Sequence, residues 1–187
     1  LEAIAHLTKG LEVLATLPAT PERTQHELDL QLALGPALMI IKGWAAPEVA
    51  RVYNQARALC QQVGDTPQLF PVLWGLWLFY IGRGEVQAAR ELGEQLLTLA
   101  QRVHDPALLV EAYHALGPTL FWLGELSAAH AYLVQGITHY DAQQHRLALH
   151  EVVRRIAVDV QAVELLLQRI KDLERHIPVQ SPDRLRV

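Results

Sequence analysis

Residues 63–89 read VGDTPQLFPVLWGLWLFYIGRGEVQAA, and residues 103–129 read VHDPALLVEAYHALGPTLFWLGELSAA. Each stretch opens on an Asp and a Pro, continues through an apolar run to a Gly-Glu pair, and ends on two alanines. Corresponding residues lie about 40 positions apart, a spacing typical of stacked helix pairs. Each copy therefore predicts a helix, a tight glycine turn and a second helix. Because one such pair cannot enclose a core alone, we expect the pairs to bury their faces by stacking.

The composition favours a globular α-helical chain. Its 187 residues are 51% hydrophobic, which is ample for a continuous core. A net charge of −4 gives no electrostatic footprint for nucleic acid or an anionic membrane. The single cysteine, Cys60, excludes an internal disulfide and a cysteine-based zinc site, which favours a cytoplasmic protein. The longest apolar run, 70–81, is too short to span a bilayer.

Helix-start signals recur along the chain. Residues 2–16 form an amphipathic pattern, and Thr20 then precedes Pro21, as a capping residue precedes a proline in the first turn of a helix. The same signal recurs at 66–67 and 105–106. We therefore expect an incomplete first helix and three helix pairs in a right-handed stack, with helices at 21–42 and 46–63, 67–82 and 86–103, and 106–123 and 126–140.

Two of the expected first helices contain Leu-Gly-Pro, at 34–36 and 116–118. An interior proline removes a backbone donor and clashes one turn back, which predicts a kink. Two short helices in place of each long one are the alternative.

The second helix of each pair carries an apolar stripe that we expect to face inward. The predicted stripe residues are Val49, Val52, Ala56, Leu59 and Val63; Ala89, Leu92, Leu96, Leu99 and Val103; and Leu126, Ala129, Leu133, Ile137 and Tyr140. Cys60 lies beside the first stripe, which favours a small core side chain over a reactive thiol.

The pattern changes after residue 146. Apolar residues then alternate in steps of four and three, at Leu149, Val153, Ile156, Val160, Val163, Leu167 and Ile170. This predicts a helix over 147–176 with a coiled-coil-like seam, within a segment 147–178 that follows repeats 1–146 and precedes a frayed tail, 179–187. The seam must be buried, either as a cap on the third pair or against another chain, as in a homodimer through 149–173.

No catalytic constellation is recognisable. The chain has no glycine-rich phosphate loop, and its two serines, Ser127 and Ser181, lie outside any nucleophile elbow. Glu111 and His114 have a spacing used in carboxylate-bridged metal helices, but such sites need further glutamates, so a polar helix face is the better interpretation. The looser group of His139, Asp141 and His145 is better explained as histidines near a helix end. We expect no enzyme activity, metal or cofactor.

Residues 115–129 resemble a tetratricopeptide repeat. The matching residues are Gly117 in mid-helix, Gly124 in the turn and Ala129 in the second helix, and Gly84 and Ala89 match in the second pair. Trp77 there replaces the mid-helix glycine, and the period is longer than the usual 34 residues.

Three stretches are similar to a narrower group. ELDLQLALGPAL (27–38), QVGDTPQLFPVLWGLW (62–77) and ARELGEQLL (89–97) resemble the repeat region of bacterial multidomain proteins that carry nucleotide-cyclase and P-loop ATPase domains. The resemblance covers about 1–146. It implies a sensory or protein-interaction segment, similar in layout to the repeat region of the maltose-regulon activator. The cyclase and ATPase motifs themselves are absent from this sequence.

In tetratricopeptide proteins the first helix of each pair lines a concave groove. The resemblance therefore implies ten groove residues, namely Asp29, Leu32, Met39, Trp74, Leu78, Ile81, Glu111, His114, Phe121 and Trp122. The aromatic members could instead belong to the core.

Two functions from different classes follow from the resemblance. The first is a non-catalytic module that binds a protein or peptide on its concave face and regulates linked catalytic domains in a bacterial signalling protein. The second is a small-molecule sensor, as in inducer-binding activators. An apolar groove open to a peptide favours the first, and a closed pocket with convergent polar groups favours the second.

Overall fold

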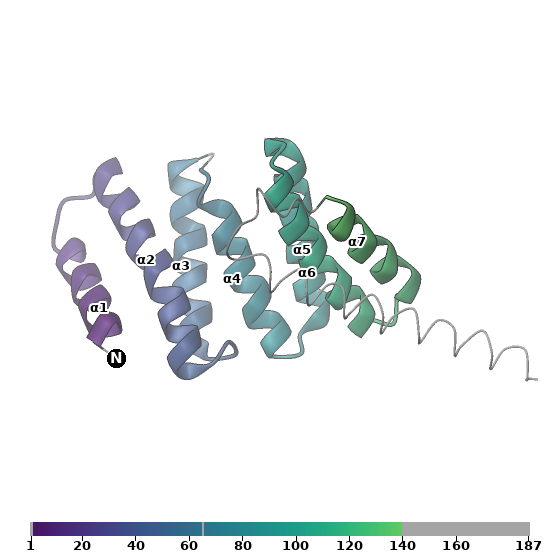
Figure 1. Cartoon of the computed structure of the whole chain (residues 1–187). Coiled ribbons are helices and arrows are strands. Elements are labelled where there is room, and N and C mark those ends of the chain that lie inside the picture. Colours follow the sequence, from purple (N-terminus) through teal and green to yellow (C-terminus); the bar gives the residue numbers. More distant parts are fainter. Residues whose placement is uncertain (1, 65, 140–187) are drawn as a thin grey trace, which may run out of the picture.

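The computed structural model describes residues 2–64 and 66–139 (Figure 1). Within these residues the chain forms helices and no strand, and consecutive helices lie side by side in a row. Helix α1 precedes three antiparallel pairs, which confirms the expected all-α helix-pair stack. The helices are α1 (Glu2–Ala15), α2 (Pro21–Lys42), α3 (Pro47–Val63), α4 (Leu69–Gly82), α5 (Val86–Val103), α6 (Pro106–Trp122) and α7 (Leu126–Thr138).

The glycine turns of the second and third pairs are the same structure. Gly84 and Gly124 have positive φ angles of 72° and 79°. The next residue in each turn, Glu85 or Glu125, donates its N–H to the carbonyl five residues earlier, at 3.0 and 2.9 Å. A non-glycine residue adopts this left-handed conformation only at a penalty, so the repeated glycines set the reversal between the paired helices.

The predicted helix starts are correct at two of three places. The Thr20 Oγ1 accepts the N–H of Arg23 at 3.2 Å, and the Asp105 Oδ1 accepts the N–H of Ala107 at 2.8 Å. Helix α4, however, begins at Leu69 and not at residue 67, because 67–68 form a turn in which the Gln68 N–H is directed at the Thr66 Oγ1.

The interior prolines do not divide their helices. Helix α2 runs continuously past Pro36, and α6 runs past Pro118. The alternative of two short helices at each site is therefore wrong. Both prolines lie in the C-terminal part of their helix, where Pro36 is exposed and Pro118 is half-buried.

The second helices of the first two pairs bury corresponding residues. Six positions are buried in both α3 and α5, each exactly one 40-residue period apart. The buried residues are Val49, Val52, Tyr53, Ala56, Leu59 and Cys60 in α3, and Ala89, Leu92, Gly93, Leu96, Leu99 and Ala100 in α5. This agreement confirms the repeat in the first pair, and the burial of Cys60, which is 2% exposed and whose thiol pKa is raised by desolvation, confirms its core position.

The prediction of burial is wrong at the C-terminal ends of the inward stripes. Val63, Val103 and Ile137 are 42%, 50% and 40% exposed. Val63 and Val103 are the last residues of α3 and α5, and Ile137 is the last but one of α7, so the helical period points them inward where little of the neighbouring helix remains to cover them. Tyr140, predicted to extend the third stripe, lies outside the described residues.

Tyr53 joins the first pair to the second. It is 4% exposed and lies against two glycines, Gly35 of α2 and Gly75 of α4. A Cβ atom built on Gly35 would lie 2.5 Å from the Tyr53 ring, and one on Gly75 would lie 2.2 Å from it. Both glycines are therefore required by the ring, which fills the space that their missing side chains leave.

The next interface reverses the arrangement of large and small residues. The α3 position held by Tyr53 is held in α5 by Gly93, and Leu116 of α6 supplies the large side chain. A Cβ atom on Gly93 would lie 2.8 Å from the Leu116 Cδ2. Corresponding interfaces are thus filled by different pairings of large and small residues, as close packing requires.

The Tyr53 hydroxyl makes the stability sensitive to alkaline pH. Burial raises the pKa of Tyr53 from 10.0 to about 12. The folded chain holds this proton more tightly than the unfolded chain. The resulting contribution of Tyr53 to the unfolding free energy is therefore complete below pH 10 and is lost as the pH rises to about 12. Relative to Tyr53→Phe, the wild type should lose about 1.4 kcal/mol of unfolding free energy between about pH 9 and 11 in urea titrations. Parallel pH profiles for the two proteins would contradict this.

No helix in the described part of the chain is long and apolar enough to cross a membrane. The predicted helix over 147–176, the seam 149–173, the tail 179–187 and the residues Asp141 and His145 all lie outside the described residues.

Candidate partner-binding surface

The first helices of the pairs form the inner side of the stack. Helix α2 approaches α4 directly, and α4 approaches α6. The backbones of α3, α5 and α7 make no comparable approach to one another in the described chain. A row of pairs whose first helices are closer together than its second helices bends toward the first helices. The concave face is therefore formed by α2, α4 and α6, as the sequence resemblance implied.

Polar side chains bridge the wider spacing on the outer side. The Arg57 Nη2 of α3 donates to the Gln95 Oε1 of α5 at 2.9 Å. Arg90 of α5 pairs with Glu94 at 2.9 Å and with Glu125, in the turn before α7, at 2.6 Å. These ion pairs are solvent-exposed and contribute little to stability. They leave the outer face polar, in contrast to the inner one.

A stripe of side chains on the first helices points away from the second helices. Its members recur in steps of three, four or seven, which places them on one side of each helix. In α2 and α6 the opposite side is identified by Gly35 and Gly117, which abut Tyr53 of α3 and Leu133 of α7. This inner stripe comprises Asp29, Ala33, Pro36 and Ile40 of α2; Pro71, Trp74, Leu78 and Ile81 of α4; and Glu111, Pro118 and Trp122 of α6.

The inner stripe repeats one chemical order in α2 and α6. An acidic residue lies seven positions before a proline and eleven before a large apolar residue: Asp29, Pro36 and Ile40 in α2, and Glu111, Pro118 and Trp122 in α6. Ile40 is 82% exposed and Trp122 is 68% exposed. Large apolar side chains so open to solvent at matching positions mark a surface suited to binding.

An aromatic cluster connects the inner sides of α4 and α6. Trp74 lies 4.9 Å from Trp77 between ring centroids and stacks on His114 at 5.8 Å. The buried Trp77 donates its Nε1–H to the Thr119 Oγ1 at 3.0 Å, and the Thr119 hydroxyl donates to the Ala115 carbonyl at 2.6 Å. The cluster fixes the spacing of the two helices, with Trp74 half-buried at its surface.

The structure separates the ten predicted groove residues into three groups. Asp29 and Trp122 are exposed. Leu32, Trp74, Leu78, Ile81, Glu111 and Phe121 are half-buried. Met39 and His114 are each 8% exposed, so they support the groove from beneath. The helical period placed these two near the groove but could not show that they are buried, His114 against Trp74 and Trp77 of α4 and Met39 in the core.

The core interpretation of Trp122 is wrong, since its side chain lies largely in solvent. It contacts Phe121 edge to face, with ring centroids 5.7 Å apart. The sequence analysis missed five residues of this surface: Ala33, Pro36, Ile40, Pro71 and Pro118. The signal that could have found Ile40 was its position four residues after Pro36, which matches that of Trp122 after Pro118.

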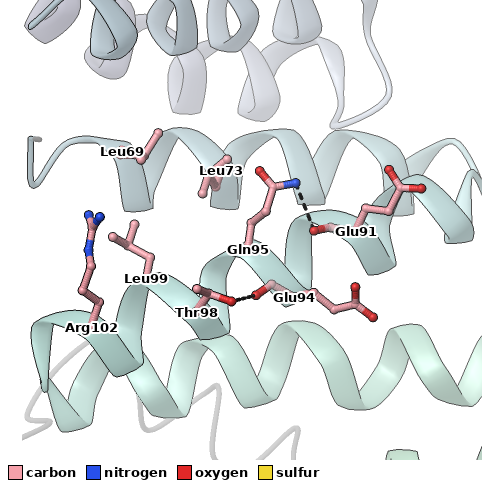
Figure 2. Close-up of a pocket in the computed structure, with 8 residues that line it drawn as sticks. All are labelled: Leu69, Leu73, Glu91, Glu94, Gln95, Thr98, Leu99 and Arg102. Carbon is pink, nitrogen blue, oxygen red and sulfur yellow. Dashed lines mark hydrogen bonds between the residues drawn. The ribbon is translucent and has the colours of Figure 1, made fainter. Parts of the chain in front are cut away.

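A hollow between α4 and α5 contains no residue of the inner stripe (Figure 2). It has a volume of about 540 Å³ and is lined by Leu69 and Leu73 of α4 and by six residues of α5. The Gln95 Nε2 donates to the Glu91 carbonyl of the same helix at 3.1 Å, and the Thr98 Oγ1 donates to the Glu94 carbonyl at 2.9 Å. The Gln95 Oε1 is engaged by Arg57 of α3. Of the predicted groove residues, Asp29 borders another hollow, between α1 and α2.

Within residues 2–64 and 66–139 no three His, Cys, Asp or Glu side chains are grouped as a metal would require. His139 instead directs its Nδ1 at the Gln135 carbonyl, 2.9 Å away, and its ring lies 5.5 Å from that of Tyr113.

No protein-family model matches the chain, and no curated protein sequence matches it. Solved structures do. Two of them come from a kinesin light chain-like protein of Podosopora anserina, described as having nearly identical TPR-like repeats. One, a variant, matches with a TM-score of 0.64 and 22% identity over 92% of this chain and 85% of that chain. The other gives 0.63 and 22% over 92% and 86%. The fold is thus a tetratricopeptide-like helical solenoid.

Proposed function

We propose that this chain is a non-catalytic interaction module whose inner stripe binds a segment of a partner protein. The observation that carries the proposal is the exposure of Ile40 and Trp122, at 82% and 68%, at matching positions of α2 and α6. A tryptophan buries about 150–250 Å² when covered, and aromatic anchors dominate the energy of many interfaces.

The stripe defines the chemistry of the partner segment. Pro71, Trp74, Leu78 and Ile81 continue the apolar surface across α4, between the exposed residues of α2 and α6. Asp29 and Glu111 lie at the other end of the stripe from Ile40 and Trp122. A segment with aliphatic or aromatic side chains and a basic residue beside the acidic end fits this order.

Replacing Trp122 separates binding from folding. Trp122→Ala should weaken partner binding at least tenfold, because an anchor worth about 2 kcal/mol or more is lost. The unfolding free energy should change by less than about 1 kcal/mol, since the side chain is 68% exposed. Peptides selected from a random library on the wild-type protein provide the probe, and calorimetry and urea unfolding provide the two readouts.

Val103→Ala is the control, because Val103 is also an open apolar side chain, 50% exposed, but lies on the second helix α5. It should keep full binding. Peptides that bind Trp122→Ala as tightly as the wild type, or that bind only through α5, would overturn the proposal. Phe121→Ala extends the test to a half-buried ring, for which we expect losses of both binding and stability.

The sequence resemblance of 1–146 supports a wider setting for the module. We infer that it belongs to a cytoplasmic bacterial signalling protein and that its partners include linked nucleotide-cyclase or ATPase domains. Partner binding at the inner stripe would then change the activity of those domains. A linked domain whose activity is the same with wild-type and Trp122→Ala modules would contradict this part of the proposal.

The alternative, a small-molecule sensor, has less support. A sensor pocket needs polar groups that converge on a ligand, and the inner stripe presents mainly apolar side chains on an open face. In the 540 Å³ hollow, Gln95 and Thr98 are already hydrogen-bonded, to Arg57 of α3 and to carbonyls of α5.

A further inference from the structure

A hollow between α1 and α2 adjoins the inner stripe. It has a volume of about 480 Å³, and the two helices that form it lie side by side at one end of the row (Figure 1). The lining residues are Lys9, Gly10, Val13 and Leu14 of α1 and His26, Asp29 and Leu30 of α2. Asp29 belongs both to this hollow and to the inner stripe. A segment bound along the stripe therefore reaches the hollow at Asp29.

Most of the lining is apolar. Val13, Leu14 and Leu30 contribute aliphatic side chains, and Gly10 contributes none. A Cβ atom built on Gly10 would lie 3.1 Å from the Leu30 Cδ1, so the glycine keeps this part of the hollow open. Val13 is 52% exposed, which leaves its side chain available for contact from outside. The hollow can therefore cover the methylene groups of a long side chain.

The hollow is negatively charged where it meets the inner stripe. The Asp29 Oδ1 accepts a hydrogen bond from the Gln25 Nε2 at 3.0 Å, and no ion pair among the described residues involves this exposed carboxylate. The Lys9 Nζ pairs with the Glu12 Oε2 at 3.0 Å, which offsets the lysine charge. With His26 neutral, Asp29 is the uncompensated charge among the lining residues.

We infer that the hollow receives the side chain of a lysine or arginine in the partner segment, with its methylene groups on Val13 and Leu30 and its cationic head on Asp29. Such a side chain combines the two chemistries that the lining offers. The inference rests on the function proposed for the inner stripe and adds a subsite formed by α1. Asp29 lies eleven residues before Ile40, about 16 Å along the helix axis. The basic residue therefore lies several positions from the residue that contacts Ile40.

An exchange of charge tests the contact. Peptides selected from a random library on the wild-type protein should carry a basic residue, and replacing it by alanine should weaken binding about threefold to fivefold. On Asp29→Asn the same replacement should change binding by less than about twofold, because the carboxylate is already absent. On Asp29→Lys, a peptide with glutamate in place of the basic residue should bind more tightly than the original peptide. Calorimetry gives the affinities, and thermal unfolding shows that these variants of an exposed residue are folded.

Two further variants separate the hollow from general electrostatics. Val13→Ala should weaken the selected peptide about twofold to fourfold, because apolar contact with the methylene groups is lost. The peptide with alanine in place of the basic residue should bind Val13→Ala and the wild type equally. Glu2→Lys is the control: it changes the net charge as much as Asp29→Lys does, but Glu2 is the first residue of α1 and lies outside the hollow. It should keep the preference for a basic residue.

Trp122→Ala distinguishes failure of this inference from failure of the proposed function. Peptides that depend on Trp122 but show no basic preference, or lose as much affinity on Glu2→Lys as on Asp29→Lys, would overturn the subsite and leave the inner stripe as the binding surface. A selection that yields no peptide weakened by Trp122→Ala would overturn both.

Discussion

Gly75→Ala should destabilise the protein by about 3 kcal/mol or more, although alanine is the better helix former. The added Cβ atom would lie 2.2 Å from the Cε1 and Cζ atoms of the Tyr53 ring. That ring cannot retreat, because Gly35 of α2 also lies against it, with a built Cβ atom 2.5 Å from the ring. The clash must therefore be relieved by moving α4 away from α3, which opens the junction between the first and second pairs. In thermal unfolding the loss corresponds to a Tm lower by about 6–12 °C.

Gly10→Ala is the matched control for this prediction. Gly10 is also a helical glycine, and its added Cβ atom would meet the Leu30 Cδ1 at 3.1 Å. The contact is with the far end of a flexible side chain, which can shift by a few tenths of an ångström. The variant should therefore be within about 1 kcal/mol of the wild type, or more stable.

A second variant keeps the prediction testable if Gly75→Ala does not fold. Tyr53→Leu removes the ring, so the double variant Gly75→Ala with Tyr53→Leu should be more stable than the sum of the two single changes predicts. Additive losses, or a Gly75→Ala protein as stable as Gly10→Ala, would show that the ring is not confined between the two glycines.

The repeat was predictable because its turns and helix starts depend on the local backbone conformation. Gly84 and Gly124 must be glycines to reach their positive φ angles. Proline recurs at helix starts because its fixed φ angle suits the first helical turn, which requires no tertiary contact. The helix pairs, their order and the all-α class therefore followed from the sequence alone.

Side-chain packing between the pairs was not predictable from periodicity. The sequence indicated that Trp77 stands where Gly117 stands in the next pair, but it gave no sign that Gly75, two residues earlier, lies against Tyr53 of the preceding pair. The second-helix position changes from Tyr53 in α3 to Gly93 in α5, and the next first helix meets it with Gly75 in one case and Leu116 in the other, so the size of that position is not fixed along the repeat. Only the three-dimensional fit of each interface decides which residue is large.

The sequence predicted which side of each first helix forms the candidate surface, but not how deeply each residue on that side is buried. A helical period assigns a residue to a side of its helix, and on that basis Trp74, Leu78 and Trp122 were placed on the inner side. It does not report how closely the next first helix approaches, so Met39 and His114 were placed in the groove although they are buried beneath it. The burial of His114 depends on the contact between α4 and α6, where it lies against Trp74 and Trp77, and these two helices are separated by a whole helix in the sequence.

Trp77 is the residue on which that contact depends most. Its side chain is 4% exposed, and its indole N–H reaches the Thr119 Oγ1 across the boundary between the second and third pairs. Trp77→Ala should lower the unfolding free energy by about 3–5 kcal/mol, since it leaves a large cavity between α4 and α6. Trp44→Ala is the control, because Trp44 is 43% exposed in the turn after α2 and should lose far less.

Two smaller substitutions measure how much the Trp77–Thr119 hydrogen bond contributes to the loss of unfolding free energy. Trp77→Phe keeps a ring and removes the N–H, and Thr119→Val removes the acceptor while keeping the shape. Thr119→Val alone should cost about 1–3 kcal/mol, because it leaves the buried indole N–H without its acceptor. The double variant should be destabilised by about 1 kcal/mol less than the sum of the single variants, measured by urea unfolding. Strictly additive losses would mean that Trp77 joins the second and third pairs by packing alone, and that Thr119 serves only its bond to Ala115 within α6.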